Sequence, residues 1–292
     1  MSDEDLLLDK RQVRRAFERA SAGYEGAAVL QHEVCRRMLE RLAYIKVEPK
    51  AILDAGSGTG NAHDALMSRY PRVPIVALDI AVGMLHEARA RRRWWQALPG
   101  LRPELHAVCG DVEQLPLADE TVGLVWSNLT LQWVNDLPRL FRDLYRVLTP
   151  GGLVMFSTFG PDTLKELREA YRGADRHTHV NRFVDMHDIG DMLVAARYAD
   201  PVMDMEPFTL TYESVRSLMR DLKAIGAHNV TRGRAEGLSG KSALDAVTRN
   251  YEALRRDGKL PATFEVVYGH AWKPLPRVSP TGRPVIDIRT ER

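Results

Sequence analysis

The sequence holds few of the residues that mark a secreted, metal-binding or membrane-spanning protein. Its 292 residues include only two cysteines, Cys35 and Cys109, too few for a disulfide framework, and both are expected to be reduced and buried. It has no run of about eighteen apolar residues that could span a membrane, and no secretory signal is expected at its N-terminus. These absences predict a soluble, cytoplasmic protein.

The chain also has almost no excess of one charge sign over the other. The formal net charge is +2, although 27% of the residues are charged. Residues 91–95 read Arg-Arg-Arg-Trp-Trp, but one basic cluster in a nearly neutral chain is weak support for nucleic-acid binding, and such residues also complement a helix dipole. His177 and His179 have no further ligand at a suitable spacing. We therefore expect neither a nucleic-acid partner nor a metal ion.

Glycine, in contrast, recurs at alternate positions after an apolar run. Residues 51–60 read Ala-Ile-Leu-Asp-Ala-Gly-Ser-Gly-Thr-Gly, which predicts a buried strand that opens into a turn at Gly56, Gly58 and Gly60. A dinucleotide site would have the spacing G-x-G-x-x-G and would bind a pyrophosphate. Here the spacing is G-x-G-x-G behind Asp54, so a different nucleotide-like ligand is expected to lie against the main chain.

A second acid ends the next apolar run. The segment Pro74-Ile-Val-Ala-Leu-Asp79 predicts a strand that ends about twenty residues after the glycines, where doubly wound folds place the carboxylate that accepts both ribose hydroxyls. The alternative role for Asp79 is that of a helix N-cap. Strand-like and helical patterns alternate as far as residue 159, which predicts a parallel sheet with helices on both faces.

The glycine pattern behind Asp54 resembles the first motif of the class I S-adenosylmethionine-dependent methyltransferases. The resemblance implies S-adenosyl-L-methionine as the cofactor, with Asp54 near its methionine ammonium and with Asp111 and Val112 at its adenine. It also implies a doubly wound, mostly parallel, seven-stranded Rossmann-like methyltransferase sheet with N-terminal helices and a helical lid or insertion. The implied cofactor-binding residues are Gln31, Asp54, Gly56, Gly58, Asp79, Ile80, Met84, Asp111, Val112 and Asn128.

We expect three parts along the chain: an N-terminal helical cap over residues 1–45, a methyltransferase domain over 46–272 with a helical insertion at about 212–256, and a mobile tail over 273–292. Within the domain, the Thr-Pro-Gly-Gly segment at 149–152 is expected to end a helix and precede a strand at 153–159. Prolines at 201 and 207 predict an edge strand over 200–211.

Longer segments resemble one family within this class. They are Phe17-Glu-Arg-Ala-Ser-Ala-Gly-Tyr24, Trp126-Ser-Asn-Leu-Thr-Leu-Gln-Trp-Val-Asn-Asp136, Phe156-Ser-Thr-Phe-Gly-Pro-Asp-Thr-Leu-Lys-Glu-Leu167 and Phe183-Val-Asp-Met-His-Asp-Ile-Gly-Asp191. Together they resemble the malonyl-acyl-carrier-protein O-methyltransferases of biotin synthesis. The same segments are similar to an arginine hydroxylase that assists assembly of respiratory complex I. An arginine hydroxylase or methyltransferase, or a non-enzymatic assembly factor that retains the cofactor pocket, is therefore the alternative.

Methylation of a malonyl carboxylate needs no strong base, because the carboxylate is ionised at neutral pH. It needs a donor that orients two oxygens, and the guanidinium fork of arginine suits this task. The candidates are Arg142 and Arg182, for which a surface cation is the alternative interpretation. The family resemblance places Tyr24 and Phe183 over the mouth of the site, where they could close around the phosphopantetheine arm of the carrier.

An acidic carrier protein implies a basic docking surface. Arg216, Arg220 and Lys223 lie near one face of a predicted helix and form the candidate patch, with an ordinary solvated helix face as the alternative. The expected oligomeric state is a monomer.

Overall fold

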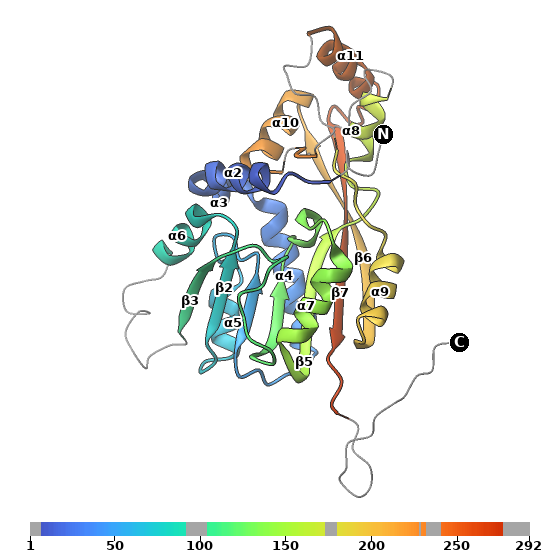
Figure 1. Ribbon diagram of the computed structural model, residues 1–292. Helices are drawn as coiled ribbons and strands as arrows, with labels where there is room; N and C mark the ends of the chain where they lie inside the picture. Colours follow the sequence, from blue (N-terminus) through green and yellow to red (C-terminus); the bar gives the residue numbers. More distant parts are fainter. Residues whose placement is uncertain (1–6, 92–103, 173–179, 228, 232–240, 277–292) are drawn as a thin grey trace, which may run out of the picture.

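The computed structural model describes residues 7–91, 104–172, 180–227, 229–231 and 241–276 (Figure 1). In this part of the chain, seven strands form one sheet in the order β3-β2-β1-β4-β5-β7-β6. The first five strands are parallel, whereas β7 is antiparallel to both β5 and β6. The predicted fold class is thus confirmed. The strands are β1 Ile52–Ala55, β2 Ile75–Asp79, β3 Leu105–Cys109, β4 Val122–Ser127, β5 Leu148–Phe159, β6 Ala199–Tyr212 and β7 Leu260–Trp272.

Helices cover both faces of the sheet because its central strands are apolar on both faces. In β1, Ile52 packs into one hydrophobic cluster with α4 (Val29–Ala43) and α5 (His63–Arg69). The next residue, Leu53, points to the opposite face and packs into a second cluster with α7 (Leu137–Val147) and α9 (Met186–Ala195). Successive side chains of a strand alternate between faces, so the run Ile52–Leu53 builds both layers at once.

The N-terminal helices break near Gly23, as the sequence indicates. Helix α2 (Lys10–Ala20) leads through a short 3-10 turn (Ser21–Gly23) to α3 (Tyr24–Ala27) and then to α4. Tyr24 thus begins a short helix rather than lying in the turn. Asp9 caps α2, since its side chain accepts hydrogen bonds from the N–H groups of Arg11 and Gln12. Figure 1 shows α2 and α3 lying across the upper ends of the strands.

Two local predictions are wrong. Strand β5 begins at Leu148, which pairs with Val122, so the Thr-Pro-Gly-Gly segment lies inside the strand, and an irregularity in the pairing after Val122 absorbs it. Cys109 is exposed rather than buried, because β3 is an edge strand of the sheet. Cys35 is buried, as predicted, and burial raises the pKa of its thiol to about 12.

Strands β6 and β7 form a long antiparallel pair that extends beyond the rest of the sheet. Pairing of β5 with β7 ends at Phe159 and Val266, whereas β6 and β7 stay paired as far as Tyr212 and Leu260. The projecting end carries α8 (Lys165–Tyr171), α10 (Val215–Ala224) and α11 (Lys241–Glu252), as Figure 1 shows. Strand β6 is an edge strand, as its prolines indicate. Among the described helices, none has the length and apolar character needed to cross a membrane.

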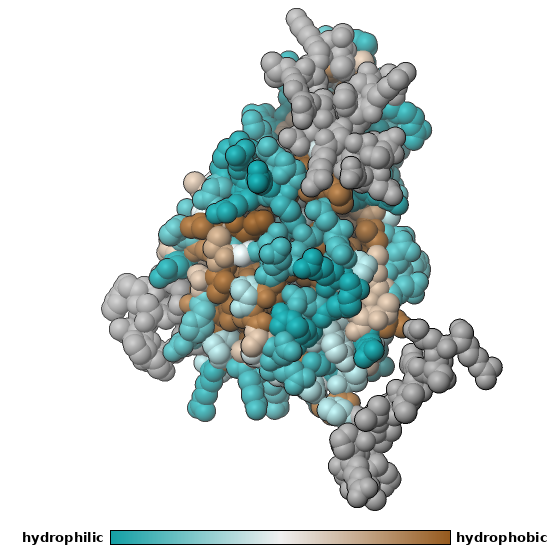
Figure 2. Space-filling view, in the orientation of Figure 1, coloured by the Kyte–Doolittle hydropathy of each residue, from teal (hydrophilic) through white to brown (hydrophobic). Residues whose placement is uncertain are grey.

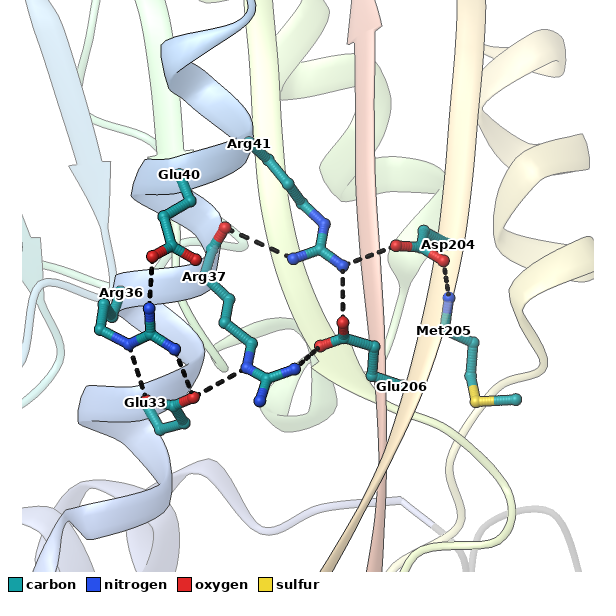
Figure 3. Close-up of polar contacts among 8 residues, drawn as sticks. All are labelled: Glu33, Arg36, Arg37, Glu40, Arg41, Asp204, Met205 and Glu206. Atoms are coloured by element: carbon teal, nitrogen blue, oxygen red, sulfur yellow. Dashed lines mark hydrogen bonds and ion pairs between the residues drawn. The ribbon is translucent and has the colours of Figure 1, made fainter.

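Ion pairs attach α4 to this edge strand (Figure 3). The Arg37 guanidinium donates to Glu206 at 2.8 Å, and Arg41 donates to Asp204 at 2.6 Å. The Arg41 guanidinium also lies 3.9 Å from the centre of the Tyr268 ring. Because the arginines of α4 face carboxylates of β6, the network orients this edge strand relative to the helix. The domain boundaries proposed from the sequence remain predictions.

Candidate functional site

The glycine turn after β1 lies at the carboxyl ends of the parallel strands. Gly56, Gly58 and Gly60 have φ values of +78°, +52° and +78°, a region that favours glycine. A Cβ atom at Gly56 would also collide with the side chain of Thr130. The turn is attached to β2, because the N–H groups of Gly56 and Ser57 both donate to the Leu78 carbonyl, at 2.8 and 2.9 Å.

Two adjoining hollows lie against this turn and share Tyr24, Gly56, Gly58 and Asn128 in their walls. We call them together the cofactor cavity. One hollow lies beside the ends of β2 and β3, and the other lies between α4 and the end of β1. All ten residues that the sequence proposes for cofactor binding line one hollow or the other: Gln31, Asp54, Gly56, Gly58, Asp79, Ile80, Met84, Asp111, Val112 and Asn128.

Asp79 is held in place by the main chain. Its two carboxylate oxygens accept hydrogen bonds from the N–H groups of Gly58 and Ala81, each at 2.9 Å. The N-cap of α6 (Val82–Ala90) is Ala81 rather than Asp79. Each Asp79 oxygen accepts one hydrogen bond from the main chain, so each keeps a lone pair for a ligand. Burial raises the pKa of the Asp79 carboxyl to about 6, against the opposing effect of these two N–H donors.

The hollow beside α4 contains buried polar atoms that lack partners among the described residues. They are Gln31 Oε1, Ser57 Oγ and Trp126 Nε1. Unpaired buried polar groups are costly, so their gathering in one hollow indicates a polar ligand. The amino-acid end of S-adenosylmethionine carries an ammonium, which needs acceptors, and a carboxylate, which needs donors. This donor and acceptor set fits that end of the cofactor.

Asp54 has a partner that the sequence pattern did not reveal. Its Oδ2 lies 2.9 Å from Nε2 of His63, and both side chains are buried. His63 is the first residue of α5, nine positions along the chain, so its spacing from Asp54 gave no signal on its own. The pair holds Asp54 in the wall of the hollow. A ligand ammonium would therefore meet a carboxylate that is already oriented.

Lys10 closes the end of the cofactor cavity that lies away from α4, beside Asp111. Its ammonium lies 3.1 Å from the Asp111 carboxylate, 3.0 Å from that of Glu113 and 3.0 Å from the Trp133 carbonyl oxygen. The ring of Phe17, also on α2, packs edge-on against Trp133 with 5.2 Å between ring centroids. Lys10 was not among the residues proposed from the sequence, because it is 101 positions from Asp111.

A second cavity of about 540 Å³ adjoins the first at Trp133, which lines both. Its walls are mainly apolar and include Phe159, Phe183 and Phe264 from the end of the sheet and the segment after α8. Phe159 and Phe183 pack edge-on, with ring centroids 5.7 Å apart. Figure 2 shows hydrophilic side chains across most of the visible face, with apolar side chains in the hollows between them. The cavity of about 540 Å³ is called the second cavity from here on.

The structure separates the residues proposed for the acceptor. Tyr24 lines the cofactor cavity, where burial, followed by the charge of Asp79, raises the pKa of its hydroxyl. Phe183 lines the second cavity. Arg182 is exposed, and its side chain is not part of either wall. Arg142 lies in a shallow groove between α7 and α9, beside Asp188. Its placement gives no support to the proposed role of orienting the malonyl carboxylate.

Other predictions fall partly outside the described residues. The structure does not describe four of the sequence features named above: His177, His179, residues 92–95 of the basic cluster and residues 277–292 of the tail. Within the described residues, no cluster of three or more histidine, cysteine, aspartate or glutamate side chains could hold a metal ion.

Comparison with known proteins agrees with this geometry. A family profile described as "Methyltransferase domain" matches residues 53–156. A solved phosphoethanolamine N-methyltransferase of Haemonchus contortus, in complex with S-adenosylhomocysteine, has the same fold, with a TM-score of 0.54 and 16% identity over 90% of this chain and 60% of that one. The chain is a class I S-adenosylmethionine-dependent methyltransferase, and S-adenosylmethionine is its cofactor.

Curated relatives define the family. A malonyl-[acyl-carrier protein] O-methyltransferase of Gallionella capsiferriformans is 60% identical over 282 residues, which cover 97% of each chain. One of Nitrosospira multiformis is 60% identical over 284 residues, covering 94% of this chain and 92% of the relative. The chain belongs to the malonyl-[acyl-carrier protein] O-methyltransferase family.

Proposed function

We propose that this protein transfers a methyl group from S-adenosylmethionine to the free carboxylate of malonyl-acyl-carrier protein, which forms a methyl ester early in biotin synthesis. The observation that carries the proposal is the 60% identity, over 97% of the chain, to a relative with that name. Two features support it: the cofactor cavity, and a separate, mainly apolar cavity that shares the wall residue Trp133.

In this proposal the chain holds the cofactor along the strand ends. Asp79 accepts hydrogen bonds from the ribose hydroxyls, and Asp111 and Val112 contact the adenine. The methionine ammonium lies beside the Asp54 carboxylate, where Gln31 and Ser57 offer further acceptors. The bound cofactor supplies a methyl group on a positively charged sulfur. Because the acceptor carboxylate is already ionised, the chain needs to position it in line and exclude water rather than remove a proton.

The second cavity is the proposed acceptor site. Phe183 shapes its wall, and Tyr24 stands in the cofactor cavity beside Asp79, where its hydroxyl stays protonated and can donate to an acceptor oxygen. Neither Arg142 nor Arg182 is proposed to hold the acceptor carboxylate, because neither side chain lines either cavity.

A direct assay tests the function. Purified protein is incubated with malonyl-carrier and cofactor labelled in the methyl group, and the labelled product is treated with base. We expect label on the carrier that base releases, as an ester requires. A protein that binds the cofactor but leaves malonyl-carrier unlabelled would favour the arginine-modifying or non-enzymatic alternatives, which the names of the relatives do not support.

The carrier protein is proposed to dock on α10. Arg216, Arg220 and Lys223 are all exposed there, and positive charge steers an acidic partner. Reversing all three charges to glutamate is expected to lower kcat/KM for malonyl-carrier roughly tenfold at low salt without changing the Kd of the cofactor. Reversal of Lys46, Lys50 and Arg72, which are equally exposed and line neither cavity, is the matched three-charge control. Equal kcat/KM in the α10 variant and the wild type would disprove the patch. The cytoplasmic location and the monomeric state remain predictions.

A further inference from the structure

The second cavity carries polar groups that the methyl transfer itself does not require. Asn181 lines it with 7% of its surface exposed, and its Oδ1 is buried without a hydrogen-bond partner among the described residues. Arg19 of α2 and Lys223 of α10 also line the cavity, but both are exposed and thus lie at its rim. The cavity therefore combines apolar walls, one unpaired amide oxygen inside and two cations at the mouth.

Contacts between distant segments place the two cations on the wall of the same cavity. The Asp9 N–H, just before α2, donates to the Val230 carbonyl at 3.0 Å, and Leu8 forms a bridge with Thr231. The turn after α10 also packs against α2, since a Cβ atom at Gly226 would lie 3.2 Å from the Phe17 ring. Within the described part of the chain, neither Arg19 nor Lys223 forms an ion pair that would neutralise it. The mouth is therefore a place for an anion.

The volume of the second cavity decides which part of the substrate can lie inside it and which part must stay at its mouth. A cavity of about 540 Å³ lies in the range of sites for small ligands, about 300–1,000 Å³, and cannot admit a protein. Only the acylated arm of a carrier can enter. Such an arm is linear, with a thioester at its acyl end, two amides along its length and a phosphodiester where it joins the protein. The phosphodiester must stay at the mouth, while the amides pass through the interior.

We propose that the second cavity binds the phosphopantetheine arm of the carrier, with its phosphodiester between Arg19 and Lys223 and one of its amide N–H groups donating to Asn181 Oδ1. This inference rests on the proposed function and adds the residues that recognise the arm. Lys223 then belongs both to the rim and to the α10 patch, so the docking surface leads directly into the cavity.

The test compares two inhibitors that differ only in the phosphate. Pantetheine and 4′-phosphopantetheine are titrated against methylation of malonyl-carrier by the full-length protein. For the wild type we expect the phosphorylated arm to inhibit about five to ten times more strongly, as two exposed cations facing one anion would give. In the Arg19→Ala, Lys223→Ala double variant this ratio should fall towards one. Arg15→Ala, an exposed cation on α2 that lines neither cavity, should retain the wild-type ratio.

A second variant tests the interior. Asn181→Leu should weaken inhibition by both arms by a similar factor, about three- to tenfold, because it removes one hydrogen bond that the arms share. Its Tm should not fall, since the Oδ1 atom that is removed has no hydrogen-bond partner among the described residues. Equal inhibition constants for the two arms in the wild type, or failure of both to inhibit, would overturn the inference while methylation of malonyl-carrier still upheld the function. A wild type that does not methylate malonyl-carrier would refute the function itself.

Discussion

The cofactor cavity and the second cavity share Trp133, but different kinds of segment build them. The first is formed mainly at the ends of parallel strands, where the loops after successive strands come together by the geometry of the sheet, and α2 closes one end of it. The second is formed by α2, α8, α10 and the projecting end of β7, which are far apart in sequence. The comparison teaches that a shared sheet can supply the methyl donor while the attached helices select the acceptor.

If the two cavities are separable, a change in the first should affect the cofactor alone. We expect Asp79→Asn to weaken cofactor binding by roughly 10- to 100-fold, because a charged acceptor of two ribose hydrogen bonds is lost. Isothermal titration with S-adenosylhomocysteine measures the effect. Circular dichroism serves as the folding control, and an unchanged Kd would exclude Asp79 from ribose binding.

The converse change lies in the second cavity. Phe183→Ala should lower kcat/KM for malonyl-carrier about tenfold, since it removes an aromatic wall that packs against Phe159. Because Phe183 lines only the second cavity, the Kd of the cofactor should stay within about twofold. Steady-state kinetics and cofactor titration on the same preparation separate the two effects. Equal losses in both measurements would show that the cavities are not independent.

The ionisation of Asp79 provides a pH test of whether the cofactor cavity acts independently of the second cavity. The pKa of this carboxyl in the folded protein, about 6, lies above its ordinary value of 3.8. The folded state therefore binds more protons than the unfolded state between these values, and Asp79 lowers stability as the pH rises through this window. Cofactor binding favours the ionised form, so affinity should increase several-fold from pH 5 to pH 7. The dependence should disappear in Asp79→Asn, and its persistence there would assign it to another group.

The smallest expected effect concerns the boundary between the cavities. Lys10→Met should weaken cofactor binding about three- to fivefold, because Lys10 joins Asp111 to the Trp133 carbonyl but remains partly exposed to water. Arg11→Met, an exposed neighbour on α2, is the matched control. Titration of both variants gives the comparison, and similar Kd values for the two would remove Lys10 from the cofactor site.

Most of the cofactor cavity was predictable because each of its residues lies within a short, patterned segment. Asp54, Asp79 and Asp111 each follow an apolar run, and parallel strands bring such ends to one edge of a sheet. The arginines proposed for the acceptor were not predictable in this way. Arg142 and Arg182 suited the chemistry, but their positions depend on how α7 and the segment after α8 pack, and neither side chain lines the second cavity.

The sequence by itself determined the alternation of strands and helices, the glycine turn and the acids behind it, because these follow from local conformational preference and short-range periodicity. Only the tertiary structure decided that Lys10 meets Asp111, that His63 orients Asp54, and that Arg19 and Lys223 face one cavity. These contacts join segments whose separation along the chain carries no pattern. The contacts of Lys10 and Arg19 arise because α2 packs over the carboxyl ends of the strands and beside the turn after α10.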